Sequence, residues 1–257
     1  MSDILTEIRD GTLWITLNRP QARNALTFEM YEALAAMCRD APTDGSVHAV
    51  VLSGAGDKAF AAGTDMTQFR AFETAQDALD YEARIEAALS AVERCPLPTI
   101  AALHGACTGG GAAIAAACDI RIATQDLKFG FPIARTLGNC LAGSNLARLS
   151  SLLGAGRVRE MVFTARLIGA EEAHACGLIS ERVADHPALM TRARELAENL
   201  SQMAPLTLRA TKEIMRRLSM TKDIEDSDLI EMCYMSRDFR EGLEAFLAKR
   251  KPEWRGT

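Results

Sequence analysis

Two short stretches of small and polar residues hold the clearest chemical pattern in this chain. The first covers residues 58–66, and the second covers residues 104–111 and ends in three consecutive glycines. Each follows an apolar run that is typical of a strand, and the second opens a predicted helix. Two such turns facing each other can direct two backbone N–H groups at one oxygen atom. That arrangement stabilises an oxyanion in acyl chemistry.

The glycines at residues 109–111 suit an oxyanion site for two physical reasons. The start of a helix leaves N–H groups unpaired and carries the positive end of the helix dipole. Glycine has no Cβ, so a ligand can approach its backbone closely. The amides of Thr64 and Gly110 could therefore hold the negative charge of a thioester carbonyl whose α-carbon has lost a proton. The alternative is that the glycines only allow a helix to pack close to a sheet.

The elements that must position these turns alternate between strand and helix. Periodicity, turn dipeptides and the N-cap residue Thr27 predict them. The expected strands cover residues 4–8, 12–17, 47–52, 99–103 and 119–123, and the expected helices cover residues 28–38, 67–94 and 109–117. This alternation predicts an α/β protein with a mostly parallel sheet that is covered by crossover helices.

The second half of the chain is predicted to be mainly helical. The expected helices cover residues 145–153, 158–165, 171–175, 187–203, 205–218 and 238–249, and one short strand covers residues 178–183. No linker rich in Gly, Ser or Pro separates the two halves. We therefore expect the helical end to pack on the sheet core.

Composition excludes several classes of function. The net charge of -5 and the low aromatic content of 5% argue against nucleic-acid binding. No window is long and apolar enough for a membrane span, and no targeting segment stands out, so a cytoplasmic protein is expected. The 7 cysteines are odd in number and form no C-x-x-C pair, which favours reduced, mostly buried thiols. The 4 histidines show no ligand spacing, so no metal site is expected.

Five motifs, taken in order and spacing, resemble those of the crotonase family, also called the enoyl-CoA hydratase/isomerase superfamily. They cover nearly the whole chain and lie at residues 17–26, 60–65, 104–111, 118–120 and 246–252. The resemblance implies an α/β fold with a crotonase-like ββα spiral core over residues 1–195. It also implies a C-terminal helical trimerisation region over residues 196–257. The expected assembly is a homotrimer or a dimer of trimers.

The resemblance also implies an acyl-CoA thioester as ligand. Coenzyme A would enter as part of the substrate, with no metal and no redox cofactor. The oxyanion donors carry over to Thr64 and Gly110, and a neighbouring subunit would contribute Phe246 and Lys249 near the nucleotide phosphates. Without the family, Lys249 is better explained as the solvated end of a charged helix. The remaining implied coenzyme A contacts are Arg23, Ala25, Leu26, Ala62, Asp65 and Met66.

The chain departs from the family where typical hydratases carry two glutamates. One position holds Ala113, and the other holds Ile133 or Ala134, depending on the alignment. These side chains cannot transfer protons, so standard hydration should be very slow. The candidates for a substitute acid or base are Arg135, Asn139, Cys140, Asp65, Glu73 and Asp77. Arg135 is the first choice, because it could bind a substrate carboxylate or stabilise an enolate.

Each candidate also has a structural interpretation. Arg135 could form a surface or intersubunit salt bridge, and Cys140 could be a packed thiol. Asp65 is expected to cap a turn or helix. Asp119 and His104, which lie beside predicted strands, are read as structural residues, and a hydrogen-bonded scaffold role is expected for His104.

Three alternative functions remain open. Residues 54–59 fit the dinucleotide-binding pattern G-x-G-x-x-A, although the pattern requires a helix to begin there. A non-catalytic acyl-CoA binder would keep the oxyanion hole without an acid–base pair. Another activity of the same family, such as isomerase, decarboxylase or thioester hydrolase, would place its acid or base elsewhere in the pocket.

Overall fold

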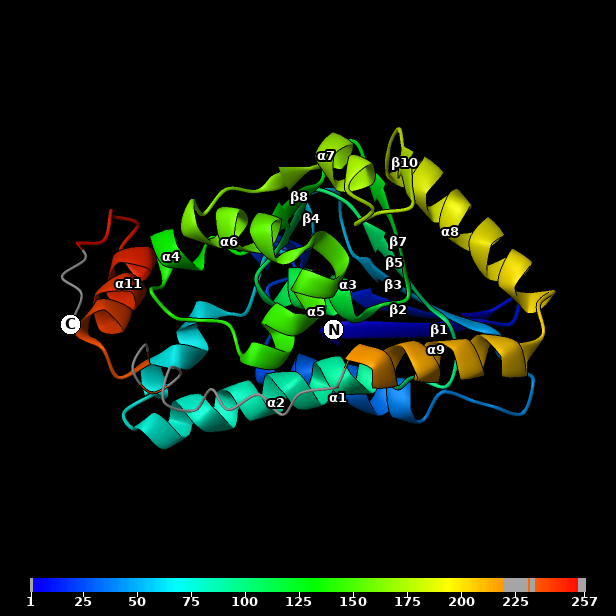
Figure 1. The fold of residues 1–257 in the computed structure, drawn as a ribbon, viewed down its shortest axis with the longest axis horizontal. Helices are drawn as coiled ribbons and strands as arrows, with labels where there is room; N and C mark the ends of the chain where they lie inside the picture. Colours follow the sequence, from blue (N-terminus) through cyan, green and yellow to red (C-terminus); the bar gives the residue numbers. More distant parts are fainter. Residues whose placement is uncertain (1, 220–230, 232–233, 254–257) are drawn as a thin grey trace.

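The computed structural model describes residues 2–219, 231 and 234–253, and in this part of the chain two β-sheets are covered by helices (Figure 1). The larger sheet has the strand order β1-β2-β3-β5-β7-β10. Its first two strands form an antiparallel hairpin, and the other neighbouring pairs are parallel. The strands are β1 (Ile4–Arg9), β2 (Thr12–Leu17), β3 (Ala49–Gly54), β5 (Thr99–Leu103), β7 (Ile120–Thr124) and β10 (Glu181–Val183).

The predicted hairpin is confirmed, together with the reason for it. Asp10 and Gly11 have φ angles of 52° and 68°. A two-residue type I′ turn needs positive φ at both central positions, and Asp-Gly tolerates this well. The predicted strand at residues 178–183 is shorter in the structure, where β10 covers only Glu181–Val183.

A smaller sheet has the strand order β4-β6-β8-β9. Its strands are β4 (Ala59–Ala61), β6 (Ala106–Thr108), β8 (Lys128–Gly130) and β9 (Ile168–Gly169). Strands β4 and β6 are parallel and lie inside the two stretches predicted as turns. Strands of two or three residues have too little periodicity to be recognised in a sequence. Their parallel pairing brings their carboxyl ends to the same edge of the sheet.

Helices cover both faces of the larger sheet. Trp14, Val51 and Ile100 pack with Leu189 of α8, whereas Ile15 and Leu52 belong to the main core with the residues of α1, α2 and α3. Successive strand residues point to opposite faces, so strands buried on both sides read as continuous apolar runs. The helices are α1 (Phe28–Arg39), α2 (Ala75–Glu93), α3 (Gly110–Ala117), α4 (Ile133–Thr136), α5 (Gly143–Leu153), α6 (Ala155–Phe163), α7 (Ala170–Ala175), α8 (His186–Ser201), α9 (Pro205–Ser219) and α11 (Arg237–Leu247).

The helix predicted over residues 67–94 is two elements in the structure. A 3-10 helix, η2 (Met66–Ala71), comes first, and α2 begins after Thr74. Thr74 caps α2 in a capping box, because its side chain accepts from the amide of Asp77 and the Asp77 carboxylate accepts from the amide of Thr74. The break lets α2 pack beside α1 while η2 turns toward α11.

Two expectations for the core, the N-cap of α1 and the buried free thiols, agree with the described residues. Thr27 caps α1 by accepting from the amide of Met30 at 3.3 Å. Free, buried thiols are found at Cys38, Cys95, Cys107 and Cys118. Cys233 lies outside the described residues. In the part that the structure describes, no helix is both long and apolar enough to cross a bilayer, and no cluster of three metal-ligating side chains is present.

Candidate oxyanion site

Thr64 and Gly110 lie next to each other at the point where the two turns meet. A Cβ built on Gly110 would lie 3.2 Å from Oγ1 of Thr64, and one built on Gly109 would lie 3.4 Å from Cα of Gly63. Parallel pairing of β4 with β6 sets this approach, because each turn leaves its strand at the same sheet edge. The two strands thus bring Thr64 and Gly110 close together, as the oxyanion prediction requires, and the direction of the two N–H groups stays a prediction.

The amide of Thr64 is held in place by hydrogen bonds on either side of it. The amide of Leu26 donates to the carbonyl of Gly63, and the amide of Asp65 donates to the carbonyl of Leu26, both at 2.8 Å. These bonds form a bridge in which Leu26 pairs with Thr64 without using the Thr64 N–H. Among the described residues, the Thr64 amide has no protein acceptor.

The amide of Gly110 is free for a different reason. Gly110 is the first residue of α3, where N–H groups have no partner inside the helix. Gly109 precedes it with a φ of 52°, which glycine adopts without strain, and its amide donates to the carbonyl of Gly130 at 3.0 Å. In the described part of the chain, the Gly110 amide meets no acceptor. The site thus holds two unused donors.

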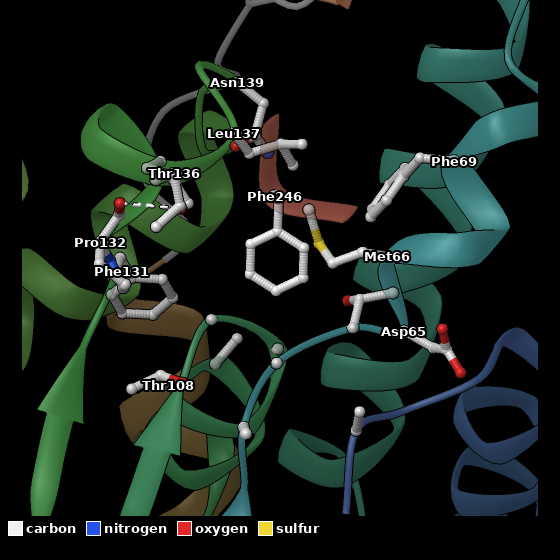
Figure 2. Close-up of a pocket in the computed structure, with 18 of the residues that line it drawn as sticks. Asp65, Met66, Phe69, Thr108, Phe131, Pro132, Thr136, Leu137, Asn139 and Phe246 are labelled. Carbon is white, nitrogen blue, oxygen red and sulfur yellow. Dashed lines mark hydrogen bonds between the residues drawn. The ribbon is translucent and has the colours of Figure 1, made fainter. Parts of the chain in front are cut away.

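Both residues line a cavity of about 610 Å³, a volume within the range of small-molecule sites. In the close-up, the ring of Phe246 points into the space between Met66 and Phe131 (Figure 2). The apolar lining includes Ala113, Phe131, Ile133, Leu137, Leu141 and Leu247. The polar and charged lining includes Arg23, Tyr81, Glu82, Lys128, Asn139 and Asn145. The cavity thus combines an apolar wall with a small set of polar groups.

Most of the residues implied as coenzyme A contacts lie in this cavity. Arg23, Ala25, Ala62, Asp65, Met66 and Phe246 line it. Leu26 is fully buried behind it, where its backbone bridges Thr64. Lys249 is exposed just past the end of α11 and is not among the lining residues.

Phe246 reaches the cavity from within the same chain. The sequence prediction placed it on a neighbouring subunit, but here α11 packs on η2 and α4 of its own chain, and α4 lies beside it in the ribbon view (Figure 1). Phe246 and Leu247 of this chain line the cavity. Phe239 of α11 lies in a cluster with Phe69 and Tyr234. These apolar contacts fold α11 back onto the core, which a sequence motif cannot distinguish from an exchange between subunits.

The positions of the two expected glutamates face the cavity but carry no carboxylate. Ala113 and Ile133 both line it, and Ala134 is exposed. Arg135, the first-choice substitute, is exposed on α4 and does not line the cavity. The structure gives its proposed role no support.

The other predicted candidates divide into two groups. Asn139 and Cys140 line the cavity, whereas Glu73 and Asp77 do not. The carboxylate of Asp77 is occupied in the capping box at the start of α2, where it accepts from the amide of Thr74. Glu73 is exposed where η2 gives way to α2.

Asp65 has the capping role that the sequence suggested. Its carboxylate accepts from the amide of Thr67 at 3.1 Å and pairs with the guanidinium of Arg19 at 2.9 Å. Burial opposes ionisation, but the hydrogen bonds from Thr67 and Arg19 outweigh it and lower the pKa of Asp65. A carboxylate held this way is a poor proton acceptor.

Asp119 and His104 also lie in structural positions. Asp119 accepts from the amide and hydroxyl of Thr99, both at 2.8 Å, and from Lys212 at 2.7 Å. His104 is buried against His186 with ring centroids 4.7 Å apart. Neither of its ring nitrogens has a hydrogen-bond partner among the described residues, so the hydrogen-bonded role expected for His104 is not found. Burial lowers the pKa of His104 to about 4, so the ring is neutral at pH 7. Neither residue lines the cavity.

Three hydroxyl groups form a chain behind the two amides. Oγ1 of Thr64 lies 2.9 Å from the hydroxyl of Tyr31 and 3.0 Å from the hydroxyl of Tyr81. Burial raises the pKa of both tyrosines, so both remain protonated. The chain fixes the side chain of Thr64 and places the Tyr81 ring at the cavity wall.

Glu82 is a cavity residue that the sequence prediction missed. It lies on α2 and accepts a hydrogen bond at 2.6 Å from the hydroxyl of Tyr234. Asn139 in turn donates to the oxygen of Tyr234 at 3.1 Å. On a polar, amphipathic helix with several acidic residues, nothing in the sequence distinguishes Glu82 from its solvated neighbours.

The dinucleotide pattern at residues 54–59 does not have the structure it requires. The glycines follow β3, but the next element is the short strand β4 and not a helix. Without a helix N-terminus beside the glycine turn, a pyrophosphate has no dipole or row of N–H groups to bind. The dinucleotide-binding prediction is therefore wrong.

Comparison with known proteins identifies the family. The family model described as enoyl-CoA hydratase/isomerase matches residues 7–257. The chain is 32% identical over 258 residues to the short-chain-enoyl-CoA hydratase of Clostridium acetobutylicum, covering 98% of this chain and 97% of that protein. The chain therefore belongs to the enoyl-CoA hydratase/isomerase family, which is the crotonase family that its motifs resemble.

Solved structures confirm the fold. The enoyl-CoA hydratase/carnithine racemase of Magnetospirillum magneticum superposes with a TM-score of 0.81 at 35% identity, covering 100% of this chain and 97% of that chain. A methylmalonyl-CoA decarboxylase in complex with 2-nitronate-propionyl-CoA superposes with a TM-score of 0.87 at 25% identity, covering 100% and 99%. The predicted α/β crotonase-like fold is thus correct.

Proposed function

We propose that this chain processes acyl-CoA thioesters by holding the thioester oxygen with the amides of Thr64 and Gly110 while negative charge develops on it. The observation that carries the proposal is that Thr64 and Gly110, whose amides have no acceptor among the described residues, lie close together at the wall of one cavity. Loss of one such preorganised donor typically costs about 10²–10³ in rate. The activity of the short-chain-enoyl-CoA hydratase relative supports the substrate class.

The cavity wall suits the two parts of such a ligand. Arg23 and Lys128 supply positive charge that can pair with the phosphates of coenzyme A. Phe131, Ile133 and Leu137 supply an apolar surface for a short acyl chain. Coenzyme A enters as part of the substrate, and the proposed chemistry uses neither a metal nor a redox cofactor.

The proposed reactions are those that need an enolate but little activation of water. Ala113 and Ile133 cannot hold or deprotonate a water molecule at the positions where they face the cavity. Proton transfer at the α-carbon, as in an isomerisation, requires only one acid–base group beside the oxyanion donors. Standard hydration of an enoyl group should therefore be slow.

Decarboxylation is the second candidate function. The structural similarity to the methylmalonyl-CoA decarboxylase favours it. Cleavage of a C–C bond to release CO₂ leaves its electron pair in an enolate, which the same two amides can hold. That step needs no base, and only the later protonation of the α-carbon needs an acid.

The proposed assembly is a homotrimer or a dimer of trimers, in which a C-terminal region over residues 196–257 makes subunit contacts. Helix α9 supports this, because Leu206, Ile214 and Met215 expose apolar side chains on it. A partner subunit would cover such a surface. Light scattering after size exclusion should give three or six times the chain mass of 27.8 kDa, and a monomer would contradict the proposal.

Mass spectrometry in deuterated water tests the proposed function. Butanoyl-, crotonyl-, 3-butenoyl- and methylmalonyl-CoA are incubated with the protein, and binding is measured in parallel by calorimetry. Deuterium incorporation, isomerisation or loss of CO₂ from any of them supports the proposal. Binding without any conversion would instead favour a non-catalytic acyl-CoA binder. Failure to bind all four would overturn the acyl-CoA assignment.

A further inference from the structure

Glu82 is a carboxylate at the cavity wall for which the oxyanion chemistry has no role. Among the described residues that line the cavity, the carboxylates are Asp65 and Glu82. Asp65 pairs with Arg19 and caps η2, and although burial opposes ionisation, these hydrogen bonds lower its pKa and make it a poor proton acceptor. If a side-chain carboxylate moves a proton in this cavity, the structure therefore points to Glu82.

Two neutral side chains form a hydrogen-bonded chain that ends on Glu82. Asn139 donates to the oxygen of Tyr234, and the hydroxyl of Tyr234 donates to Oε1 of Glu82. Burial and the nearby charge of Glu82 raise the pKa of Tyr234, so it stays a protonated donor. Both donors in this chain point toward the Glu82 carboxyl group.

Glu82 shares one compartment with the oxyanion donors. The preceding residue, Tyr81, bonds the hydroxyl of Thr64, and the hydroxyl of Tyr31 lies directly beside Gly110. The charge of Glu82 contributes to the raised pKa of both Tyr31 and Tyr81, after burial. Glu82, Thr64 and Gly110 all line the same cavity.

We propose that Glu82 is the catalytic residue that removes and returns the substrate proton, and that Tyr234 and Asn139 are its positioning residues. This inference rests on the proposed enolate chemistry. The carboxylate takes a proton from the α-carbon, the C–H electron pair forms the enolate double bond, and the thioester oxygen gains the negative charge. The carboxylic acid then returns a proton to the α-carbon or, in 3-butenoyl-CoA, to the γ-carbon. The last step restores both the thioester and the carboxylate.

The variant Glu82→Gln tests this role directly, because it keeps the size of the side chain and one oxygen that can accept from Tyr234 but cannot take up the proton. Deuterium incorporation into 3-butenoyl-CoA and butanoyl-CoA should fall by about 10²–10⁴ relative to the wild type. The affinity for butanoyl-CoA, measured by calorimetry, should change by less than about threefold. Asp80→Asn is the matched control, since Asp80 is exposed on the same helix and does not line the cavity.

A second variant, Tyr234→Phe, tests whether Tyr234 positions Glu82 or only stabilises the folded protein. Removing the donor to Oε1 destabilises the ionised carboxylate, so the acid limb of the rate profile should move to higher pH. A purely structural role for Tyr234 would lower the amount of folded protein without moving that limb. An unshifted acid limb in a folded Tyr234→Phe protein would overturn the positioning role.

The outcomes distinguish this inference from the proposed function. If the wild type incorporates deuterium and Glu82→Gln does so at a similar rate, the role of Glu82 is refuted and the oxyanion proposal stands. If Glu82→Gln loses affinity in proportion to its rate, Glu82 is a binding group and not a proton carrier. If the wild type converts no thioester, both proposals fail.

Discussion

The hydroxyl of Tyr31 occupies the space that a side chain on Gly110 would fill. A Cβ built on Gly110 would lie 1.8 Å from the Tyr31 oxygen, far below any real contact distance. Tyr31 is fully buried on α1, so it cannot move aside into solvent. The close-packing interpretation of the glycine run is thus confirmed at Gly110, and it is compatible with the proposed oxyanion role because the Gly110 amide has no acceptor among the described residues.

This contact predicts how substitutions at Gly110 and Tyr31 change the free energy of unfolding. Gly110→Ala should lower the free energy of unfolding by about 1–3 kcal/mol, as overpacked core positions do. In a Tyr31→Phe background the same substitution should cost clearly less, because the clashing oxygen is gone. Urea unfolding of the wild type, Gly110→Ala, Tyr31→Phe and the double variant gives the coupling free energy between the two positions. Gly156→Ala, where a Cβ meets nothing within 4 Å, is the control and should not destabilise the protein.

Hydration of crotonyl-CoA by the wild-type protein should be slow. Ala113 and Ile133 face the cavity without a group that can activate water, and each missing acid or base typically costs about 10²–10⁴ in rate. The decrease in the absorbance of the enoyl group reports the reaction. Rapid loss of that absorbance at low protein concentration would show that another group activates water.

Acidification should destabilise the protein through His104. Its folded-state pKa of about 4 lies below the ordinary value of 6.5, so the unfolded state binds the proton more readily. The stability held above pH 6.5 is therefore lost as pH falls from about 6.5 toward 4, by up to about 3 kcal/mol. Unfolding of the wild type and His104→Gln at pH 7.5 and pH 4.5 measures this. Equal pH dependence in the two proteins would exclude His104 as the cause.

Helices and strands with a clear hydrophobic period could be predicted from the sequence, and so could the two turns. Thr64 and Gly110 follow strand-like runs, and parallel pairing of strands brings their turns together. Glu82 was not predictable, because it is one acidic residue on an amphipathic helix, and its role depends on Tyr234, which is distant in the sequence. The position of Phe246 was also not predictable, since a motif does not show which subunit a helix covers.

The local pattern failed in two further places for physical reasons. Strands β4 and β6 are too short to show alternation, and only pairing with their neighbours defines them. Arg135 follows the position of a missing glutamate in sequence, but α4 turns its side chain into an exposed position. Proximity in sequence to a catalytic position does not give access to the cavity.

The most direct measurement compares Gly110→Pro with Gly110→Ala, both in the Tyr31→Phe background. Both variants add a Cβ beside residue 31, but only proline removes the amide donor. Proline is well tolerated at the first position of a helix, so α3 should still form. Thermal unfolding checks that both proteins are folded. We expect deuterium incorporation into 3-butenoyl-CoA to be about 10²–10³ slower in the proline variant. Equal rates in the two folded proteins would contradict an oxyanion role for Gly110.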